Sequence, residues 1–292
     1  MKQLVLCLIG ALFSGAAHGK VLHQERSLYQ NVLVVENGRE RCLQFSVKRD
    51  LRNQSCIRTD HPEEMVFSYT RMMMAALLLR DAPASILVVG LGGGTLPGAL
   101  QTLFPAARLD VVEIDPAVVR VARDYFGFIE AGNTTVHTMD ARVFGRRARA
   151  QARQYDLILL DAYNGEYIPE HLLTREYLEE TRNLLNHGGV LAANTFAISH
   201  LYDHESTTYE AVFGQFLNFR LEETANRVIL VARDGLPTAD FRAARADELQ
   251  PRVARFGIRL NDYLGALEGI RDWDADARVL TDQYAPANLL NR

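Results

Sequence analysis

The chain has 292 residues, of which 48% are hydrophobic and 23% charged, so it can bury one large core, or one core with a small satellite domain, and disorder is not expected. A formal net charge of -4 gives no electrostatic reason to bind nucleic acid or an anionic membrane, because both need a concentrated basic face. The one basic cluster, residues 142–153, is predicted to be a solvated helix face.

The first nineteen residues have the layout of a secretory signal peptide. Lys2 precedes an apolar run at residues 4–13, and the small residues that follow suit cleavage after Ala17 or Gly19. The run is too short to span a bilayer. We therefore expect a periplasmic or secreted protein without stable membrane insertion. The alternative is that this segment is a buried helix of a cytoplasmic protein.

Residues 20–62 are predicted to form a small β-strand module. The expected strands are residues 30–36, 41–47 and 55–59. Between the first two, Asn37-Gly38 is a strong signal for a two-residue hairpin turn. Cys42 and Cys56 then lie on neighbouring strands, where they form a disulfide if both point to the same face, or remain two buried thiols.

From residue 63 the pattern changes, and this is the expected domain boundary. Residues 63–79 are predicted to be a helix, and further helices are expected at 239–256 and 259–271. Apolar strand patterns that alternate with helical ones occur at residues 86–89, 109–114, 135–138, 157–160, 190–194 and 227–232. Such alternation predicts an α/β fold over residues 63–292, with a mostly parallel sheet covered by helices.

A glycine-rich turn follows the first of these strands and leads into a helix at residues 96–103. Its glycines are Gly90, Gly92, Gly93 and Gly94. Glycine lets the backbone approach a ligand closely, and the start of the helix adds partial positive charge. A plain tight turn would also use glycine.

Acidic residues follow three later strands. Glu113 ends the next strand, nineteen residues after Gly94, where a carboxylate can accept hydrogen bonds from the ribose hydroxyls of an adenosine-containing cofactor. Asp140 follows a further strand, where a carboxylate can bind the adenine amino group in methyltransferase-type Rossmann folds. Asp161 ends the fourth strand, at the crevice where ligands bind in open α/β sheets. The alternative is that Asp140 and Asp161 only cap helices or turns.

Taken together, residues 27–196 resemble the polyamine aminopropyltransferase family, spermidine synthase and its relatives. Ser27-Leu-Tyr29-Gln30 resembles the family's opening strand, whose glutamine lies near the cofactor. Tyr69-Thr-Arg-Met72 stands in place of Tyr-His-Glu-Met, and residues 90–95 stand in place of Gly-Gly-Gly-Asp-Gly-Gly. Glu113, Asp115 and Asp140 match the adenosine-binding acids, and Asp161 begins the Asp-Ser-Ser-Asp-Pro motif. The resemblance implies a Rossmann-like, methyltransferase-type fold with a small N-terminal strand module, and a homodimer.

The chain also departs from the family. Asn164 stands where the family carries the aspartate that accepts the amine proton, Gly93 replaces the motif aspartate, and Thr70-Arg71 replaces His-Glu. Residues 161–174 and the tail at 280–286 are closer to a spermidine-synthase-like branch that also occurs fused to membrane transporters.

The resemblance implies a transferase that uses decarboxylated S-adenosylmethionine or S-adenosylmethionine as co-substrate and transfers an aminopropyl group to a polyamine. Asn164 cannot accept a proton, so Asp161 and Glu166 are the catalytic candidates, with His171 a further acceptor if it faces the crevice. The substrate-binding candidates are Tyr69, Arg71 and Tyr163. We expect no metal, because the eight histidines are scattered and the cysteines pair with none of them at ligand spacing.

Two other functions remain open from the sequence. Arg71 can supply a cation for the carboxylate of intact S-adenosylmethionine, which would fit a methyltransferase, or it can be a surface arginine. Export favours a third possibility, a binding protein that kept the fold and lost catalysis, because adenosyl cofactors are made in the cytoplasm.

Overall fold

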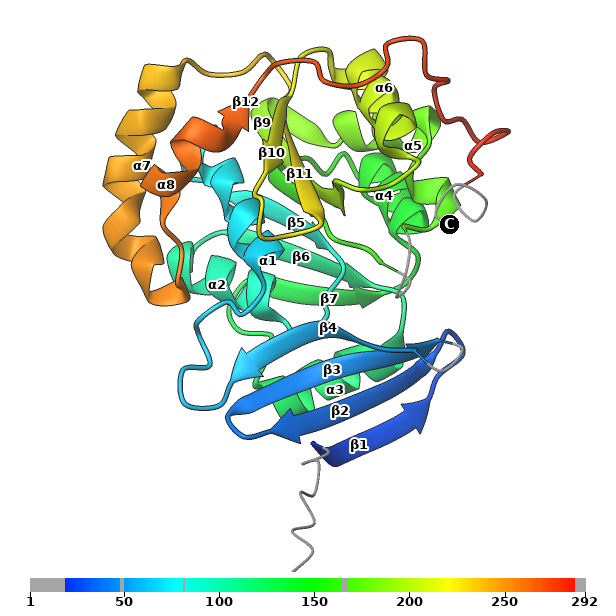
Figure 1. Ribbon diagram of the computed structural model, residues 1–292, viewed down its shortest axis with the longest axis vertical. Helices are drawn as coiled ribbons and strands as arrows, with labels where there is room; N and C mark the ends of the chain where they lie inside the picture. Colours follow the sequence, from blue (N-terminus) through cyan, green and yellow to red (C-terminus); the bar gives the residue numbers. More distant parts are fainter. Residues whose placement is uncertain (1–18, 48–49, 81, 164–167, 287–292) are drawn as a thin grey trace, which may run out of the picture.

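The computed structural model describes residues 19–47, 50–80, 82–163 and 168–286. An antiparallel four-stranded sheet, in the order β1-β2-β3-β4, lies below a larger eight-stranded sheet (Figure 1). Its strands are β1 Lys20–Arg26, β2 Asn31–Asn37, β3 Glu40–Val47 and β4 Asp50–Arg58. The predicted N-terminal strand module is therefore present, and the predicted leader, residues 1–19, falls outside the described residues except for Gly19.

Two parts of this module differ from the prediction. The third predicted strand begins at Asp50 rather than at residue 55. In addition, the opening strand lies at β1 and not at residues 27–30, which form the turn between β1 and β2, where the amide of Ser27 donates to the carbonyl of Gln30. The sequence of β1 is mostly polar and lies at the sheet edge without an apolar alternation, so this strand was not predicted. Cys42 and Cys56 are register partners on β3 and β4 and form a disulfide, which selects between the two states that the sequence left open.

One face of the small sheet packs on helix α3, Pro116–Phe126, of the larger domain (Figure 1). Val32, Val34 and Leu43 from the strands share a buried apolar cluster with Val118 and Val121 from the helix. Burial of this surface fixes the small sheet against the larger domain.

The larger sheet has the order β12-β10-β11-β9-β8-β5-β6-β7, and the strands from β9 to β7 are mutually parallel. The bounds are β5 Ser85–Val89, β6 Arg108–Glu113, β7 Thr134–Thr138, β8 Tyr155–Leu160, β9 Leu185–Phe196, β10 Leu217–Arg220, β11 Asn226–Ala232 and β12 Leu267–Glu268. The predicted mostly parallel α/β sheet is confirmed. The antiparallel pairs that β10 makes with β11 and β12 extend one edge.

Helices cover both faces of this sheet (Figure 1). They are α1 Ser68–Met73, α2 Thr95–Leu103, α4 Ala141–Ala150, α5 Arg175–Arg182, α6 Tyr202–Phe213, α7 Ala239–Val253 and α8 Leu260–Tyr263, with shorter turns η1 Met74–Leu78, η2 Glu170–Leu172, η3 Ala254–Phe256 and η4 Leu264–Ala266. Among the described residues, no helix is long and apolar enough to cross a membrane.

The helix expected at residues 63–79 is shorter than predicted, since it begins at Ser68. Met65 is fully buried and its amide donates to the carbonyl of Phe256, which holds the preceding segment outside a helix. The helix expected at 259–271 is also interrupted. It ends at Tyr263, and the strand β12 then pairs with β10 at the sheet edge.

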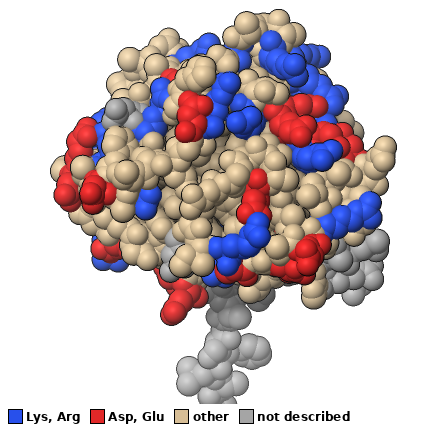
Figure 2. All heavy atoms as spheres, turned by 90° about the horizontal axis from the view of Figure 1, so that it is seen from above, with Lys and Arg blue, Asp and Glu red and all other residues tan. Residues whose placement is uncertain are grey.

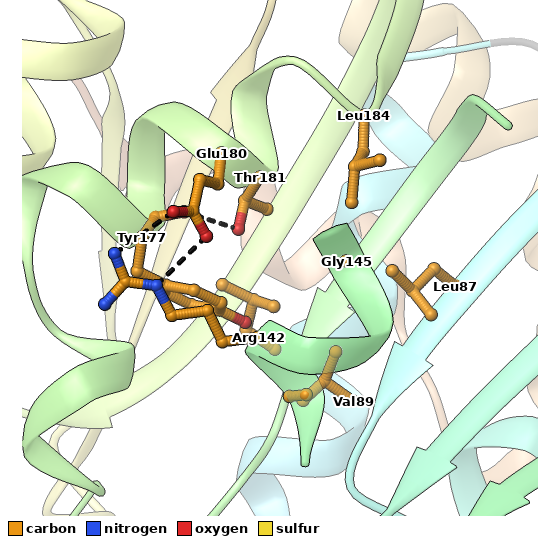
Figure 3. A pocket seen from close by; sticks show the side chains of 10 residues that line it. Leu87, Val89, Arg142, Gly145, Tyr177, Glu180, Thr181 and Leu184 are labelled. Carbon is orange, nitrogen blue, oxygen red and sulfur yellow. Dashed lines mark hydrogen bonds and ion pairs between the residues drawn. The ribbon is translucent and has the colours of Figure 1, made fainter. Parts of the chain in front are cut away.

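The basic cluster on α4 is not the uniformly solvated face that was predicted. Arg142 is only 9% exposed, and its guanidinium donates to Glu180 at 3.0 Å and to Asp282 at 2.7 Å. Figure 3 shows the side chain lying toward Glu180 of α5. Arg142 therefore ties α4 to α5 and to the C-terminal segment, while Arg147 and Arg149 are exposed.

Candidate functional site

A cavity of about 730 Å³ opens at the carboxyl ends of the parallel strands. Its lining comes from the small sheet, from α1, from the loops after β5, β6, β7 and β8, and from β9 and the β10–β11 connection. This volume is typical of a site for a small molecule, roughly 300–1,000 Å³, and the position is where open α/β sheets bind ligands. Elsewhere, the face in Figure 2 carries basic and acidic side chains interspersed.

The glycine turn forms one wall of the cavity. Gly90 has a φ of +99°, and a Cβ atom there would lie 2.1 Å from the carbonyl oxygen of Asp161, so only glycine allows the two strand ends to meet. Gly92 also lines the cavity. Gly93 and Gly94 do not, because their α-carbons face Ser55 and Phe128. The structure therefore brings two of the four predicted glycines to the cavity.

Glu113 and Asp115 have different environments. Glu113 lines the cavity and accepts hydrogen bonds from the backbone amides of Leu91, at 3.1 Å, and Asp115, at 2.9 Å. Burial raises the pKa of Glu113. Asp115 is fully buried and does not line the cavity. It caps α3 by accepting from the amide of Ala117 at 2.9 Å, and it accepts from the hydroxyl of Ser27 at 2.6 Å. Asp115 therefore has a structural role next to the site and does not face the cavity.

Asp140 belongs to the cavity and is also a helix cap. Its Oδ1 accepts from the amide of Val143 at 2.9 Å at the start of α4, and its Oδ2 lies 2.8 Å from Nε2 of His171. Burial opposes the charge of Asp140, but the hydrogen bonds from Val143 and His171 outweigh it and hold its pKa below the usual value. His171 lines the cavity as well. The capping and ligand interpretations of Asp140 are therefore compatible.

Asp161 is the carboxyl group of the cavity whose pKa is best suited to proton transfer. Its pKa is raised to about 7. Burial is the largest cause and the charge of Glu113 adds to it, while the hydrogen bonds from Asn194 and Tyr69 oppose it. The amide nitrogen Nδ2 of Asn194 lies 2.9 Å from Oδ1 of Asp161. A carboxyl group that titrates near neutral pH is suited to accept a proton from a bound substrate.

Several buried polar atoms of the cavity lining have no partner among the described residues. They are Oε1 of Gln30, Oγ1 of Thr95 and the hydroxyl of Tyr163. Buried polar groups are normally satisfied, so their position on the cavity indicates hydrogen bonds to a ligand or to water. Gln30 and Tyr163 were predicted site residues. Thr95 was missed because only the glycines of the motif at residues 90–95 were predicted to contact a ligand.

Arg71 is not part of the cavity lining. Its guanidinium donates to the carbonyl oxygens of Met65, at 2.6 Å, and Val66, at 3.3 Å, and to the hydroxyl of Ser68 at 3.1 Å. The structure gives no support to Arg71 as the partner of a cofactor carboxylate, nor is it a free surface arginine. Asn164, at the position of the family's proton-accepting aspartate, and Glu166, the second candidate base, lie outside the described residues.

Three further residues at the far end of the cavity were missed from the sequence. Glu223, Thr224 and Asn226 come from the connection between β10 and β11 and from the start of β11. Nothing in a short polar turn distinguishes a ligand contact from a solvated loop. Only the pairing of β11 with β9, and of β10 with β11, reveals these residues.

The comparisons with known proteins agree with this geometry. The chain is 47% identical over 288 residues to a polyamine aminopropyltransferase of Vibrio vulnificus, covering 98% of this chain and 96% of the relative. A probable spermidine synthase from Corynebacterium glutamicum has a similar fold, with a TM-score of 0.64, 17% identity and coverage of 88% and 98% of the two chains. Human methyltransferase-like protein 13, solved in complex with SAH, gives a TM-score of 0.54 at 26% identity and coverage of 77% and 100%. Residues 66–222 match the family model of the spermine/spermidine synthase domain, and the chain belongs to this family.

Proposed function

We propose that this protein transfers an aminopropyl group from decarboxylated S-adenosylmethionine to an amine. The observation that carries the proposal is the half-buried Asp161, whose pKa is about 7, at the glycine turn of a cavity that also contains Glu113 and Asp140. Glu113 would accept from the ribose hydroxyls and Asp140 from the adenine amino group. This placement leaves the sulfonium side of the cofactor toward Asp161.

In the reaction, the neutral amine attacks the carbon next to the sulfonium sulfur. The new carbon–nitrogen bond forms as the carbon–sulfur bond breaks, and methylthioadenosine leaves with the bonding electron pair. The proton lost by the attacking nitrogen passes to Asp161. The protein contributes alignment of the two reactants and a base whose pKa is near neutral.

The charges of the cavity favour the decarboxylated cofactor over intact S-adenosylmethionine. Among the described residues that line the cavity, four are acids, namely Glu113, Asp140, Asp161 and Glu223, and Arg52 is the one lysine or arginine. Such a surface attracts cations and repels a carboxylate. The guanidinium of Arg71 is directed to backbone carbonyl groups instead.

Methyl transfer from S-adenosylmethionine is the second candidate, supported by the 26% identity to the human methyltransferase-like protein.

The purified protein should be incubated with 1,4-diaminobutane and with each cofactor in turn. We expect methylthioadenosine to form from the decarboxylated cofactor, and its formation to be lost in Asp161→Asn. S-adenosylhomocysteine formed from the intact cofactor would instead identify a methyltransferase. Failure to bind any adenosyl compound would indicate a binding protein that kept the fold and lost catalysis.

We also propose that the chain is exported, which for the proposed reaction requires a source of decarboxylated S-adenosylmethionine outside the cytoplasm. The Cys42–Cys56 disulfide supports this, because disulfides persist in oxidising compartments. Expression in a bacterial host followed by fractionation and intact mass measurement tests the proposal. We expect a periplasmic product that lacks the residues up to Ala17 or Gly19, whereas a cytoplasmic product that retains Met1 or Lys2 would overturn it.

A further inference from the structure

Two segments that are far apart in the sequence meet at the end of the cavity where Asp140 lies. Asp140 precedes α4, and His171 lies in the short turn η2 between β8 and α5. Nε2 of His171 is 2.8 Å from Oδ2 of Asp140, and both residues line the cavity. The side chains of His171 and Asp140 are 46% and 26% exposed, so the contact is open to a molecule that enters the site.

The contact with His171 is one of two hydrogen bonds that fix the carboxylate of Asp140. The pKa of Asp140 lies below its usual value, so the carboxylate is ionised near neutral pH and can only accept. Nε2 of His171 is therefore the donor to Oδ2, while the backbone amide of Val143 donates to Oδ1 at 2.9 Å. The terminal torsion of an aspartate is otherwise broad. Because a carboxylate has about four acceptor positions, Asp140 keeps acceptor capacity for a ligand and is held in one orientation.

The C-terminal segment joins the same two parts of the chain outside the cavity. The guanidinium of Arg142 donates to both carboxylate oxygens of Asp282, at 2.7 and 2.8 Å, and the hydroxyl of Thr174 donates to Oδ1 at 2.7 Å. Arg142 lies two residues after Asp140, and Thr174 lies three residues after His171. The position of His171 relative to Asp140 therefore does not depend on their own hydrogen bond alone.

We propose that His171 positions Asp140 for the exocyclic amino group of adenine and so determines the purine specificity of the site. This inference rests on the proposed function, because it takes Asp140 as the contact of that amino group. An acceptor held in one direction favours a base that carries a donor at this position over a base that lacks it. His171 acts through Asp140, so it is a positioning residue and takes no part in the proton transfer at Asp161.

The experiment compares two nucleosides by calorimetric titration. They are methylthioadenosine and its 6-deamino analogue, which carries hydrogen in place of the amino group. A hydrogen bond that is no longer well directed lowers affinity about three- to tenfold. We expect His171→Ala to lose affinity for methylthioadenosine by that factor and to bind the analogue as the wild type does, so the preference for the amino group falls. His171→Gln keeps an N–H donor and should retain most of this preference.

His187→Ala is the matched control. His187 is also exposed and its Nδ1 lies 3.4 Å from a carboxylate oxygen of Asp234, but it does not line the cavity. This variant should bind both nucleosides as the wild type does. Equal losses of affinity for the two nucleosides in His171→Ala would show that His171 only supports the fold of the site, and would overturn the inference.

These binding measurements need no turnover, so they separate this inference from the proposed function. If the wild type forms no methylthioadenosine from the decarboxylated cofactor but His171→Ala loses the preference for the amino group, the reaction fails and the role of His171 stands. If the wild type transfers the aminopropyl group and His171→Ala keeps the full preference, the role of His171 is wrong and the reaction stands. Absence of nucleoside binding in the wild type overturns both.

Discussion

Asn194 donates a hydrogen bond of 2.9 Å from its side-chain nitrogen to Oδ1 of Asp161. The contact arises from strand register. Leu160 at the end of β8 pairs with Ala193 of β9, so the next residue on each strand meets its neighbour at the carboxyl edge of the sheet. Asn194 stabilises the ionised form of Asp161 and opposes the burial that raises its pKa to about 7.

The rate of transfer should depend on the ionisation of Asp161. Because the base must be deprotonated, kcat/KM corrected for the fraction of neutral amine should rise about tenfold per pH unit below pH 7 and level off above it. Replacing Asn194 with alanine removes a hydrogen-bond donor to the carboxylate and so raises the pKa of Asp161. The rising part of the pH–rate profile should therefore move to higher pH. Initial-rate profiles of both proteins provide the measurement. A pH profile of Asn194→Ala that rises over the same pH range as the wild type would show that Asp161 is not the titrating base.

Asp161→Asn should abolish transfer and stabilise the unliganded protein. The folded pKa of Asp161 lies above its unfolded value of 3.8, so the folded state binds the extra proton between these values and stability falls as pH rises from about 4 to about 7. Asparagine cannot ionise and avoids this loss. Thermal unfolding should show no gain for the variant near pH 4 and a gain at pH 8. An equal gain at both pH values would argue against a raised pKa of Asp161.

Much of the fold was predictable from residues whose signals are local. The apolar strands β5, β6 and β8 and the Asn37-Gly38 turn are read directly from the sequence. The polar edge strand β1 and the four-residue strand β10 have no clear apolar pattern, so they were missed.

The candidate site was less predictable, because a motif position does not say which way a carboxylate points. Asp115 follows the same strand as Glu113, but it caps α3 and accepts from Ser27, while Glu113 faces the cavity. Glu223 carries no motif and reaches the cavity only through the pairing of β10 with β11. The homodimer implied by the family resemblance stays a prediction.

Glu113→Gln should weaken the binding of methylthioadenosine about 10- to 100-fold, which is the effect expected for hydrogen bonds to a charged acceptor, roughly 1.5–3 kcal/mol. Asp115→Asn is the control, since Asp115 is fully buried and does not line the cavity. That variant should lower thermal stability and leave affinity within about twofold of the wild type. Calorimetric titration and thermal unfolding of both variants test this. Equal losses of affinity would place Asp115 at the nucleoside after all.

Reduction of the Cys42–Cys56 disulfide should destabilise the protein. The two cysteines are 14 residues apart, and a crosslink that closes a loop of this length contributes about 3 kcal/mol in the chain-entropy model. Urea denaturation with and without dithiothreitol, beside a Cys42→Ser/Cys56→Ser variant, measures the effect. The double variant should match the reduced wild type and should not respond to the reductant. A midpoint that reductant leaves unchanged in the wild type would mean that the disulfide does not stabilise the small sheet.

Gly90→Ala should disrupt the site far more than Gly98→Ala. A Cβ at position 90 would lie 2.1 Å from the carbonyl oxygen of Asp161, and its φ of +99° is unfavourable for any residue with a side chain, so the strand end must move away from the proposed base. Gly98 lies inside α2, and a Cβ there would meet nothing within 4 Å. Alanine at position 98 should therefore stabilise the helix by about 1 kcal/mol. Thermal unfolding and methylthioadenosine titration of both variants provide the test. Wild-type affinity in Gly90→Ala would show that the close approach of the glycine turn to Asp161 is not needed to form the cavity.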